Sequence, residues 1–159
     1  MKQFIAKIYS SLKFDYQRTL IVVVSILFMV KIVVVFIFQD AIGVWEDDVI
    51  ARNMLETGEM FYMQRGTPNY MFQFPVYPSL LFGIYKLFGY NPLYAVVFNL
   101  LMISIISFLL FEIFIYASST LGLKPGEIKT ELIAFLTVLS FLFHPFISFY
   151  SMFKVHPFV

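Results

Sequence analysis

A long apolar run at residues 19–38 (TLIVVVSILFMVKIVVVFIF) constrains this chain more than any other feature. About 20 such residues in a helix cross the roughly 30 Å hydrocarbon layer of a bilayer. A cleaved signal peptide has a shorter apolar core and a small-residue cleavage site, and this run has neither. A helix also satisfies its backbone hydrogen bonds within its own segment, as lipid requires. We therefore expect a retained membrane-spanning helix.

The composition of the whole chain points the same way. Of the 159 residues, 60% are hydrophobic and 13% are charged, whereas soluble domains are about 25% charged. The net charge of +1 excludes a protein that binds nucleic acid by electrostatic attraction. With no cysteine, the chain has neither disulfides nor thiolate metal sites. The sequence predicts an all-α membrane protein.

Two more apolar segments, residues 93–117 and 131–150, bring the predicted spans to about three. A long loop at residues 39–92 separates the first two spans, and a short link at residues 118–130 joins the second to the third. Pro145 is expected to kink or end the third span, because proline lacks the backbone N–H that a helix interior needs.

The basic residues predict the orientation of the spans. The tail at residues 1–18 has four Lys or Arg and the link at residues 118–130 has two, whereas the loop at residues 39–92 has three in a much longer stretch. Lys and Arg concentrate on the cytoplasmic side of membrane proteins. We expect the tail and the link to be cytoplasmic, and the loop and residues 151–159 to be external, in the cell (inner) membrane.

Two helices are predicted within the loop. Residues 45–59 (WEDDVIARNMLETGE) have acids in the first turn and Gly58 near the end. Residues 78–88 (PSLLFGIYKLF) start with proline, stop before Gly89 and are too short to span, so we expect a helix lying in the outer interface. The aromatic residues around it are expected at the level of the lipid headgroups; they are Tyr70, Phe72, Phe74, Tyr77, Tyr85, Tyr90 and Tyr94.

Three adjacent carboxylates, Glu46, Asp47 and Asp48, are the first candidates for chemistry. Neighbouring carboxylates repel one another, which raises a pKa or attracts a cation. One of them could act as a general base on an acceptor hydroxyl, or the group could hold a divalent metal against a phosphate leaving group. The alternative is a solvated helix start whose acids complement the helix dipole.

Lys31 and Glu112 are the charges placed within the predicted spans. Lys31 lies about two turns from Phe38, so we expect its side chain to snorkel to the outer interface. Glu112 lies near the inner end of its span, where snorkelling or pairing with a neighbouring helix explains it.

The order of motifs in the first loop resembles that of polytopic glycosyltransferases. Residues 45–55 (WEDDVIARNML) are followed by Gly58, then residues 74–81 (FPVYPSLL), and then Leu87-Phe88-Gly89 before the second span. This set is similar to the first external loop of the glycosyltransferase-C superfamily, of the protein mannosyltransferase and aminoarabinose transferase type (family 39). The resemblance covers roughly residues 19–149.

The resemblance implies an enzyme that takes a sugar from a polyprenyl-phosphate carrier on the external face of the membrane. Its catalytic acid maps to Glu46, with Asp47 or Asp48 as substitutes, and it deprotonates or orients the acceptor, with inversion at the sugar carbon. The helix after Pro75 then shapes the cavity for the lipid-linked donor. Arg52 and Arg65, together with Tyr77, are the expected substrate-binding residues. No cofactor is implied beyond the divalent metal considered above.

The resemblance also has departures. The acid pair of the family is here Glu46-Asp47-Asp48, and family members have many more spans than this chain, which reaches Val159 just past the third. We therefore expect an amino-terminal portion or a truncated reading frame that is inactive alone.

Two other functions fit the same sequence. The first is a small non-catalytic membrane protein that assembles with partner subunits through its aromatic-rich helices. The second is part of a transporter, with Lys31 and Glu112 lining a path, although these two charges lie towards opposite faces of the membrane.

Overall fold

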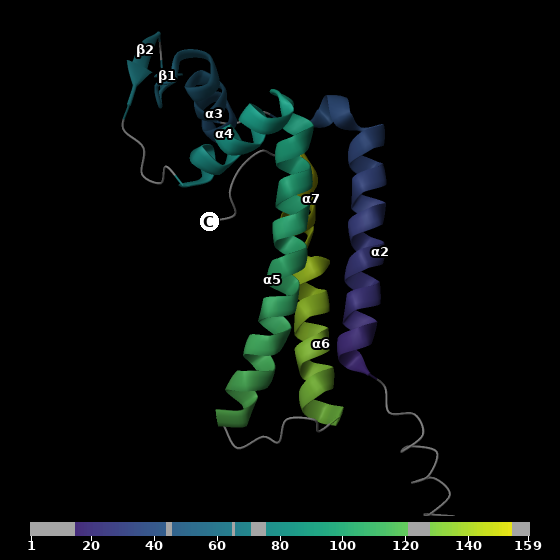
Figure 1. Cartoon of the computed structure of the whole chain (residues 1–159). Coiled ribbons are helices and arrows are strands. Elements are labelled where there is room, and N and C mark those ends of the chain that lie inside the picture. The colour runs from purple at the N-terminus through teal and green to yellow at the C-terminus, as the bar shows by residue number, and fades with distance from the viewer. Residues whose placement is uncertain (1–14, 44–45, 65, 71–75, 121–127, 154–159) are drawn as a thin grey trace, which may run out of the picture.

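The computed structural model describes residues 15–43, 46–64, 66–70, 76–120 and 128–153. Three long elements stand side by side: α2 (Tyr16–Ile37), α5 (Pro92–Thr120) and α6 (Ile128–Leu142). Figure 1 shows that α3 (Glu46–Thr57), α4 (Val76–Phe88) and a small hairpin gather beside one end of this bundle. We call this end, where α2 finishes and α5 begins, the loop end. The opposite end, between α5 and α6, is the link end.

The helices α2 and α5 are long and apolar enough to cross a membrane. At 1.5 Å per residue they measure about 33 Å and about 44 Å. Only 17% of the most apolar stretch of α2 and 33% of that of α5 is buried inside the protein. The exposed side chains of α2 include Ile26, Met29 and Val33, which in water would form the kind of large apolar patch that soluble monomers avoid.

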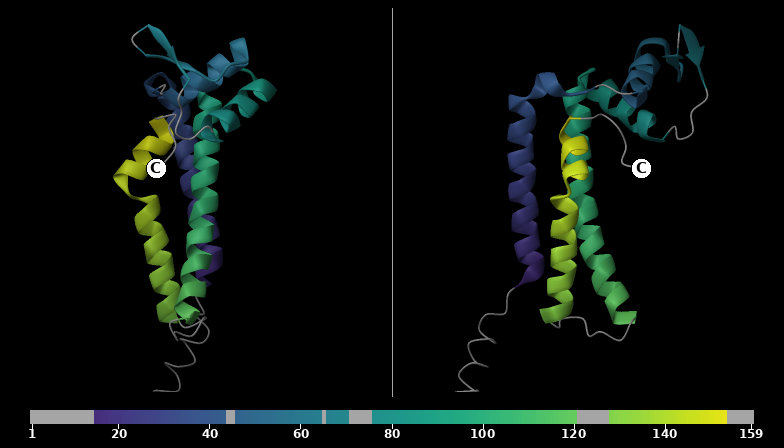
Figure 2. Two further views of the ribbon diagram at one scale, coloured as in Figure 1. Left: turned by 90° about the vertical axis from the view of Figure 1, so that its left-hand side faces the viewer. Right: turned by 180° about the vertical axis from the view of Figure 1, so that it is seen from behind.

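The predicted third span is divided in two. Helix α6 ends at Leu142, and α7 (Pro145–Phe153) begins after Phe143 and His144. The proline is the first residue of α7, where its missing N–H costs nothing, and the interruption falls where the sequence predicts a kink. Figure 2 shows α7 turned away from the axis of α6. At about 22 Å, α6 alone is shorter than a bilayer core.

The predicted loop helices are both present. The helix expected at residues 45–59 is α3 (Glu46–Thr57), and the one expected at residues 78–88 is α4, which starts earlier, at Val76. Gly89 ends α4 with a φ of 86° and donates its N–H to the Tyr85 carbonyl, 2.9 Å away. Glycine adopts this left-handed conformation without strain.

The all-α prediction left out a hairpin. Strands β1 (Tyr62–Gln64) and β2 (Thr67–Asn69) pair antiparallel, with Met63 opposite Pro68. Three-residue strands have almost no periodic signal, and Asn53 of α3 supplies a tertiary anchor by donating its Nδ2 to the Phe61 carbonyl at 2.8 Å. The described chain is otherwise helical.

Two clusters of buried side chains hold the elements together. Towards the link end, α2, α5 and α6 meet around Leu20, Val24, Ile103 and Val138. Towards the loop end, a second cluster joins α2, α3, α4 and α5; its buried members are Val35, Ala51, Leu81, Tyr85, Ala95, Val96 and Leu100. This second cluster fixes α3 and α4 against the bundle.

Candidate functional site

The three carboxylates of α3 have three different environments. Glu46, the first residue of the helix, is exposed, and Asp47 is half-buried. Asp48 is completely buried, with 0% of its surface exposed. Asp48 is buried because it lies on the side of α3 that packs against α4, where Tyr85 meets it.

Asp48 is held by two tyrosine hydroxyls. Tyr85 of α4 donates a short hydrogen bond to its Oδ1, and Tyr90 donates to its Oδ2 at 2.8 Å. The two tyrosine rings meet edge to face with centroids 5.1 Å apart. A buried carboxylate with both oxygens bonded is a stable internal link, and here it joins α3 to α4 and to the turn that follows α4.

Burial and the Asp48 carboxylate together shift these tyrosines. Loss of solvent, followed by the bond to Asp48, raises the pKa of Tyr90 to about 12. The same two causes, in the same order, raise the pKa of Tyr85 well above its usual range. Each phenolate would be desolvated beside a carboxylate, so both tyrosines remain protonated donors over the whole physiological range.

Arg52 lies on the exposed side of α3. It pairs with Glu56 one turn on, Nε to Oε1 at 2.7 Å, and its guanidinium sits 5.2 Å from the centre of the Tyr90 ring. An exposed pair of this kind adds little to stability, because water screens both charges. The guanidinium therefore stays accessible to an anion near the Asp48–Tyr90 link.

Tyr77 turns inward from the first turn of α4. Its hydroxyl donates to Oδ1 of Asn99 on α5 at 2.8 Å, and burial is the main reason that its pKa lies above the usual range. Asp47 and Asp48 also oppose ionisation of Tyr77 through their charge, which places these carboxylates electrostatically close to it. The amide Nδ2 of Asn99 is buried and has no partner among the described residues.

An apolar groove of about 330 Å³ lies between α4 and α5. Its volume falls within the range of small-molecule sites, and its lining is almost entirely apolar. The lining residues are Ile84 and Phe88 of α4 and Tyr94, Val97, Phe98 and Leu101 of α5. Thus α4 carries the acidic helix α3 on one side and forms a hydrocarbon-lined groove with α5 on another.

The structure thus places five of the six predicted site residues. Glu46, Asp47, Asp48 and Arg52 share α3, and the charges of Asp47 and Asp48 act on Tyr77 of α4. Arg65 lies outside the described residues. Among the residues described, no group of three His, Asp or Glu side chains gathers in a way that would hold a metal ion.

Sequence reasoning missed the partners of these residues. Tyr85 and Tyr90 were expected in the headgroup belt, but their hydroxyls are turned to Asp48. Asn99 was not singled out, although an amide within a long apolar helix is a signal for an interhelical hydrogen bond. The position of Asp48 in the first turn of a helix does not indicate such a bond, because the helix dipole alone explains a carboxylate there.

Lys31 also departs from its predicted position. Its Nζ is buried and has no partner among the described residues, so the side chain does not snorkel to the interface. Glu112 is exposed near the link end and accepts a hydrogen bond from Gln17 Nε2 at 3.2 Å, consistent with its expected pairing with a neighbouring helix.

Comparison with known proteins adds no relative: no family model, curated protein or solved structure matches this chain.

Proposed function

We propose that the chain crosses the cell membrane with its N-terminus in the cytoplasm and the loop end outside. The length and uncovered apolar surface of α2 and α5 support this placement. The basic residues of the tail and link support the direction. In this setting α4, a short apolar helix, lies at the outer interface and places α3 just outside the membrane.

We further propose that the chain is the amino-terminal membrane portion of a glycosyltransferase that moves a sugar from a polyprenyl-phosphate carrier to an external acceptor. One observation carries this proposal: α4 is shared between the carboxylate-bearing α3 and the apolar groove on α5. A lipid-linked donor needs both environments side by side, a hydrocarbon groove for its chain and polar groups for its sugar phosphate.

The reaction assigns separate tasks to the carboxylates. Glu46 or Asp47, the exposed and half-buried acids, takes the proton from the acceptor hydroxyl. The acceptor oxygen then bonds to the anomeric carbon as the bond from that carbon to the phosphate oxygen breaks. Polyprenyl phosphate leaves with the electron pair, and the sugar carbon is inverted. Asp48, fully bonded, positions α3 and touches no substrate.

The remaining residues meet the donor. Arg52 offers its guanidinium to the phosphate, which matches its geometry and charge. Tyr77, near Asp47, orients the sugar while its bond to Asn99 fixes the ring. Arg65 is proposed as a second phosphate contact, on the basis of the resemblance alone.

The test introduces Glu46→Gln and Asp47→Asn separately at the chromosomal locus, so that any further segments or partner subunits are present. Membranes are then supplied with labelled polyprenyl-phosphate sugars, and transfer to acceptor is measured. We expect at least one variant to abolish transfer while the amount of protein in the membrane stays normal.

Glu59→Gln is the matched control, because this acid lies beyond α3 and contacts Tyr70 rather than the acidic cluster. It should leave transfer unchanged. Unaltered transfer in both the Glu46 and Asp47 variants would refute the assignment of the acidic cluster.

One observation favours the alternative function, a non-catalytic membrane subunit that assembles with partners. The buried Nζ of Lys31 has no partner among the described residues, and α2 leaves most of its surface uncovered. A chain with normal membrane assembly but no transfer activity of its own would agree with this alternative.

A further inference from the structure

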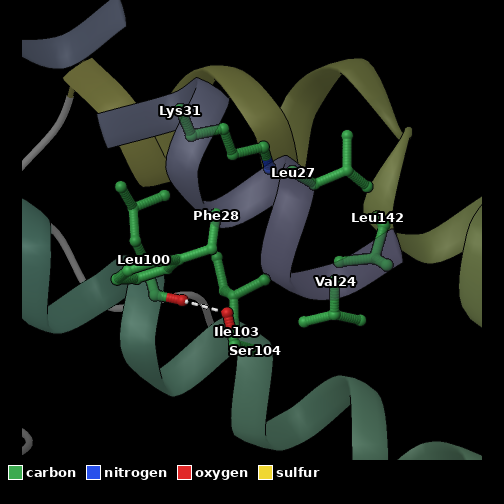
Figure 3. Close-up of a pocket in the computed structure, with 8 residues that line it drawn as sticks. All are labelled: Val24, Leu27, Phe28, Lys31, Leu100, Ile103, Ser104 and Leu142. Atoms are coloured by element: carbon green, nitrogen blue, oxygen red, sulfur yellow. Dashed lines mark hydrogen bonds between the residues drawn. The ribbon is translucent and has the colours of Figure 1, made fainter. Parts of the chain in front are cut away.

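Lys31 places an amine inside the bundle with nothing to bond. Its Nζ is shielded by the surrounding side chains and has no hydrogen-bond partner among the described residues. Figure 3 shows the side chain running away from its own backbone towards Leu27, with the α6–α7 segment behind it. Ionisable groups at such depth are costly and normally paired, so an unpaired one indicates a missing partner.

The space around this amine is very small. The cavity at Lys31 has a volume of about 10 Å³, which is room for about one water molecule. It is lined by Val24, Leu27 and Phe28 of α2, by Leu100, Ile103 and Ser104 of α5, and by Leu142 of α6. One water would give the amine a hydrogen bond but would not neutralise its charge.

The polar groups at the cavity are only partial partners. Ser104 donates its own hydroxyl to the Leu100 carbonyl at 2.9 Å, and that hydroxyl oxygen keeps lone pairs but no net charge. Leu142 is the last residue of α6, so the partial negative charge of a helix C-terminus, about half an elementary charge, lies at the cavity. Both features favour a cation at the cavity, but neither supplies a full negative charge to neutralise the amine.

No carboxylate of the described helices α2, α5, α6 and α7 lies in the loop half of the bundle. Glu112 bonds to Gln17 at the far end of α2, 14 residues and so about 21 Å along the helix from Lys31. Glu131 is in the first turn of α6, also at the link end. None of the described residues of these four helices therefore supplies a charged partner for Lys31.

We propose that Lys31 pairs with the carboxylate of a partner transmembrane helix, one with an Asp or Glu about 10 Å below the outer surface. That depth is the rise of the seven residues from Lys31 to Phe38. The partner packs along the edge of α2 next to Lys31, where Val30 and Ile37 are exposed. This pairing depends on the membrane placement but not on the sugar-transfer chemistry.

The length of the lysine side chain allows its amine to move from the cavity to a partner. Its four methylene groups allow the amine to turn from the water-sized cavity towards a carboxylate at the edge of α2. The pair then forms in hydrocarbon, where opposite charges attract strongly and any unpaired charge is penalised. A partner helix without a carboxylate would leave the lysine charge unpaired, so this penalty favours an acidic helix over a neutral one.

The experiment uses the full chain in phosphatidylcholine vesicles with a synthetic single-span Leu/Ala helix as the probe. The probe has one Glu two turns from its outer end, and a matched probe has Gln at the same position. Association is measured by energy transfer between a label on the probe and one on the chain's N-terminal tail. We expect the Glu probe to bind wild-type chain roughly tenfold more tightly than the Gln probe.

Variants separate the charge from the packing. Lys31→Leu should abolish the preference for the Glu probe, and Lys31→Arg should retain it. Lys86→Leu is the control, because this lysine is exposed on α4, outside the bundle, and should change nothing. Helix content and elution volume in detergent establish that each variant is folded.

Equal binding of the Glu and Gln probes by wild-type chain overturns the proposal, as does an unchanged preference in folded Lys31→Leu. If Lys31→Leu instead weakens only the binding of anionic lipid added to the vesicles, the amine serves a lipid phosphate and the helix-pairing proposal is wrong.

Discussion

Asp48 shows how the environment of a single residue decides its role. The sequence presents Glu46, Asp47 and Asp48 as equivalent, yet the fold exposes the first, half-buries the second and encloses the third between two tyrosines. A carboxylate with none of its surface exposed is out of reach of a substrate hydroxyl. Its contribution is to connect α3 with α4.

Replacing Asp48 with alanine should therefore destabilise the protein. The buried Tyr85 hydroxyl would lose its acceptor, at a cost of about 1–3 kcal/mol, whereas the hydroxyl of Tyr90, which is 37% exposed, can turn to water. We expect a lower thermal unfolding temperature in detergent and faster protease cleavage of α3. Asp40→Ala, which removes an exposed carboxylate from the same loop, is the control. Equal stability of the two variants would show that the Asp48 link contributes nothing.

The ionisation of Tyr90 gives a second prediction. Its pKa is raised from 10.0 to about 12 by burial and by the bond to Asp48, so the folded state favours the protonated form. The stability that this bond supplies is complete below about pH 10 and is lost as the pH rises towards 12. In a spectroscopic titration of tyrosinate, Tyr90→Phe should remove a late step near pH 12. Removal of a step near pH 10 instead would mean that the bond to Asp48 does not raise the pKa of Tyr90.

How far the sequence predicts this site depends on which residue is considered. The acids at the start of α3 are evident from their spacing, because charge and helix periodicity are local properties. The enclosure of Asp48 is not evident, because Tyr85 lies 37 and Tyr90 42 positions away in the chain. The position of Lys31 was predicted wrongly for a related reason. The prediction of snorkelling treated α2 as a single helix in lipid, whereas α5 and α6 pack against α2 and enclose the amine.

At the scale of elements, α4 is the part on which the rest depends. It packs against α3 through Leu81 and Tyr85, and against α5 beside the groove. Its end was predictable from Gly89, which constrains the backbone directly, whereas its start at Val76 lies two residues before the Pro78 from which it was predicted. The groove was not predictable from the sequence, because it forms only where α4 and α5 pack together.

Filling the groove should separate lipid binding from chemistry. Val97→Trp places a large side chain where Val97 now lines the groove. If the groove holds the donor's prenyl chain, we expect the KM for a long-chain donor to rise about tenfold or more while a short-chain, water-soluble donor is affected much less. Leu109→Trp, on an exposed face of α5 further towards the link end, is the control. Equal effects on both donors would place the prenyl chain elsewhere.

The break between α6 and α7 gives a further test at this scale. Proline at position 145 cannot donate an N–H to the carbonyl of Phe141, and the His144 N–H takes that carbonyl instead at 3.2 Å. Pro145→Ala should restore the missing donor and straighten the segment. Spin labels at Thr137 and Ser148 would then report a changed and narrower distance distribution. Pro92→Ala, at the start of α5, should leave the distribution unaltered.

At the scale of the whole molecule, bulk composition was the most reliable guide. The amount of apolar sequence predicted membrane-spanning helices, and α2 and α5 are long and apolar enough to be such spans. Pro145 predicted the division of the third apolar segment, whereas the hairpin beside α3 was not predicted. Both depend on a few local contacts that composition does not record.

Membrane placement is the claim on which every other proposal depends, and the absence of cysteine makes it directly measurable. Glu56→Cys, on the exposed side of α3, and Thr120→Cys, at the link end of α5, each introduce a single thiol. In intact cells, a membrane-impermeant maleimide should label the first at once and the second only after permeabilisation. The reverse pattern, or labelling of both in intact cells, would contradict a chain that crosses the membrane with its acidic helix outside.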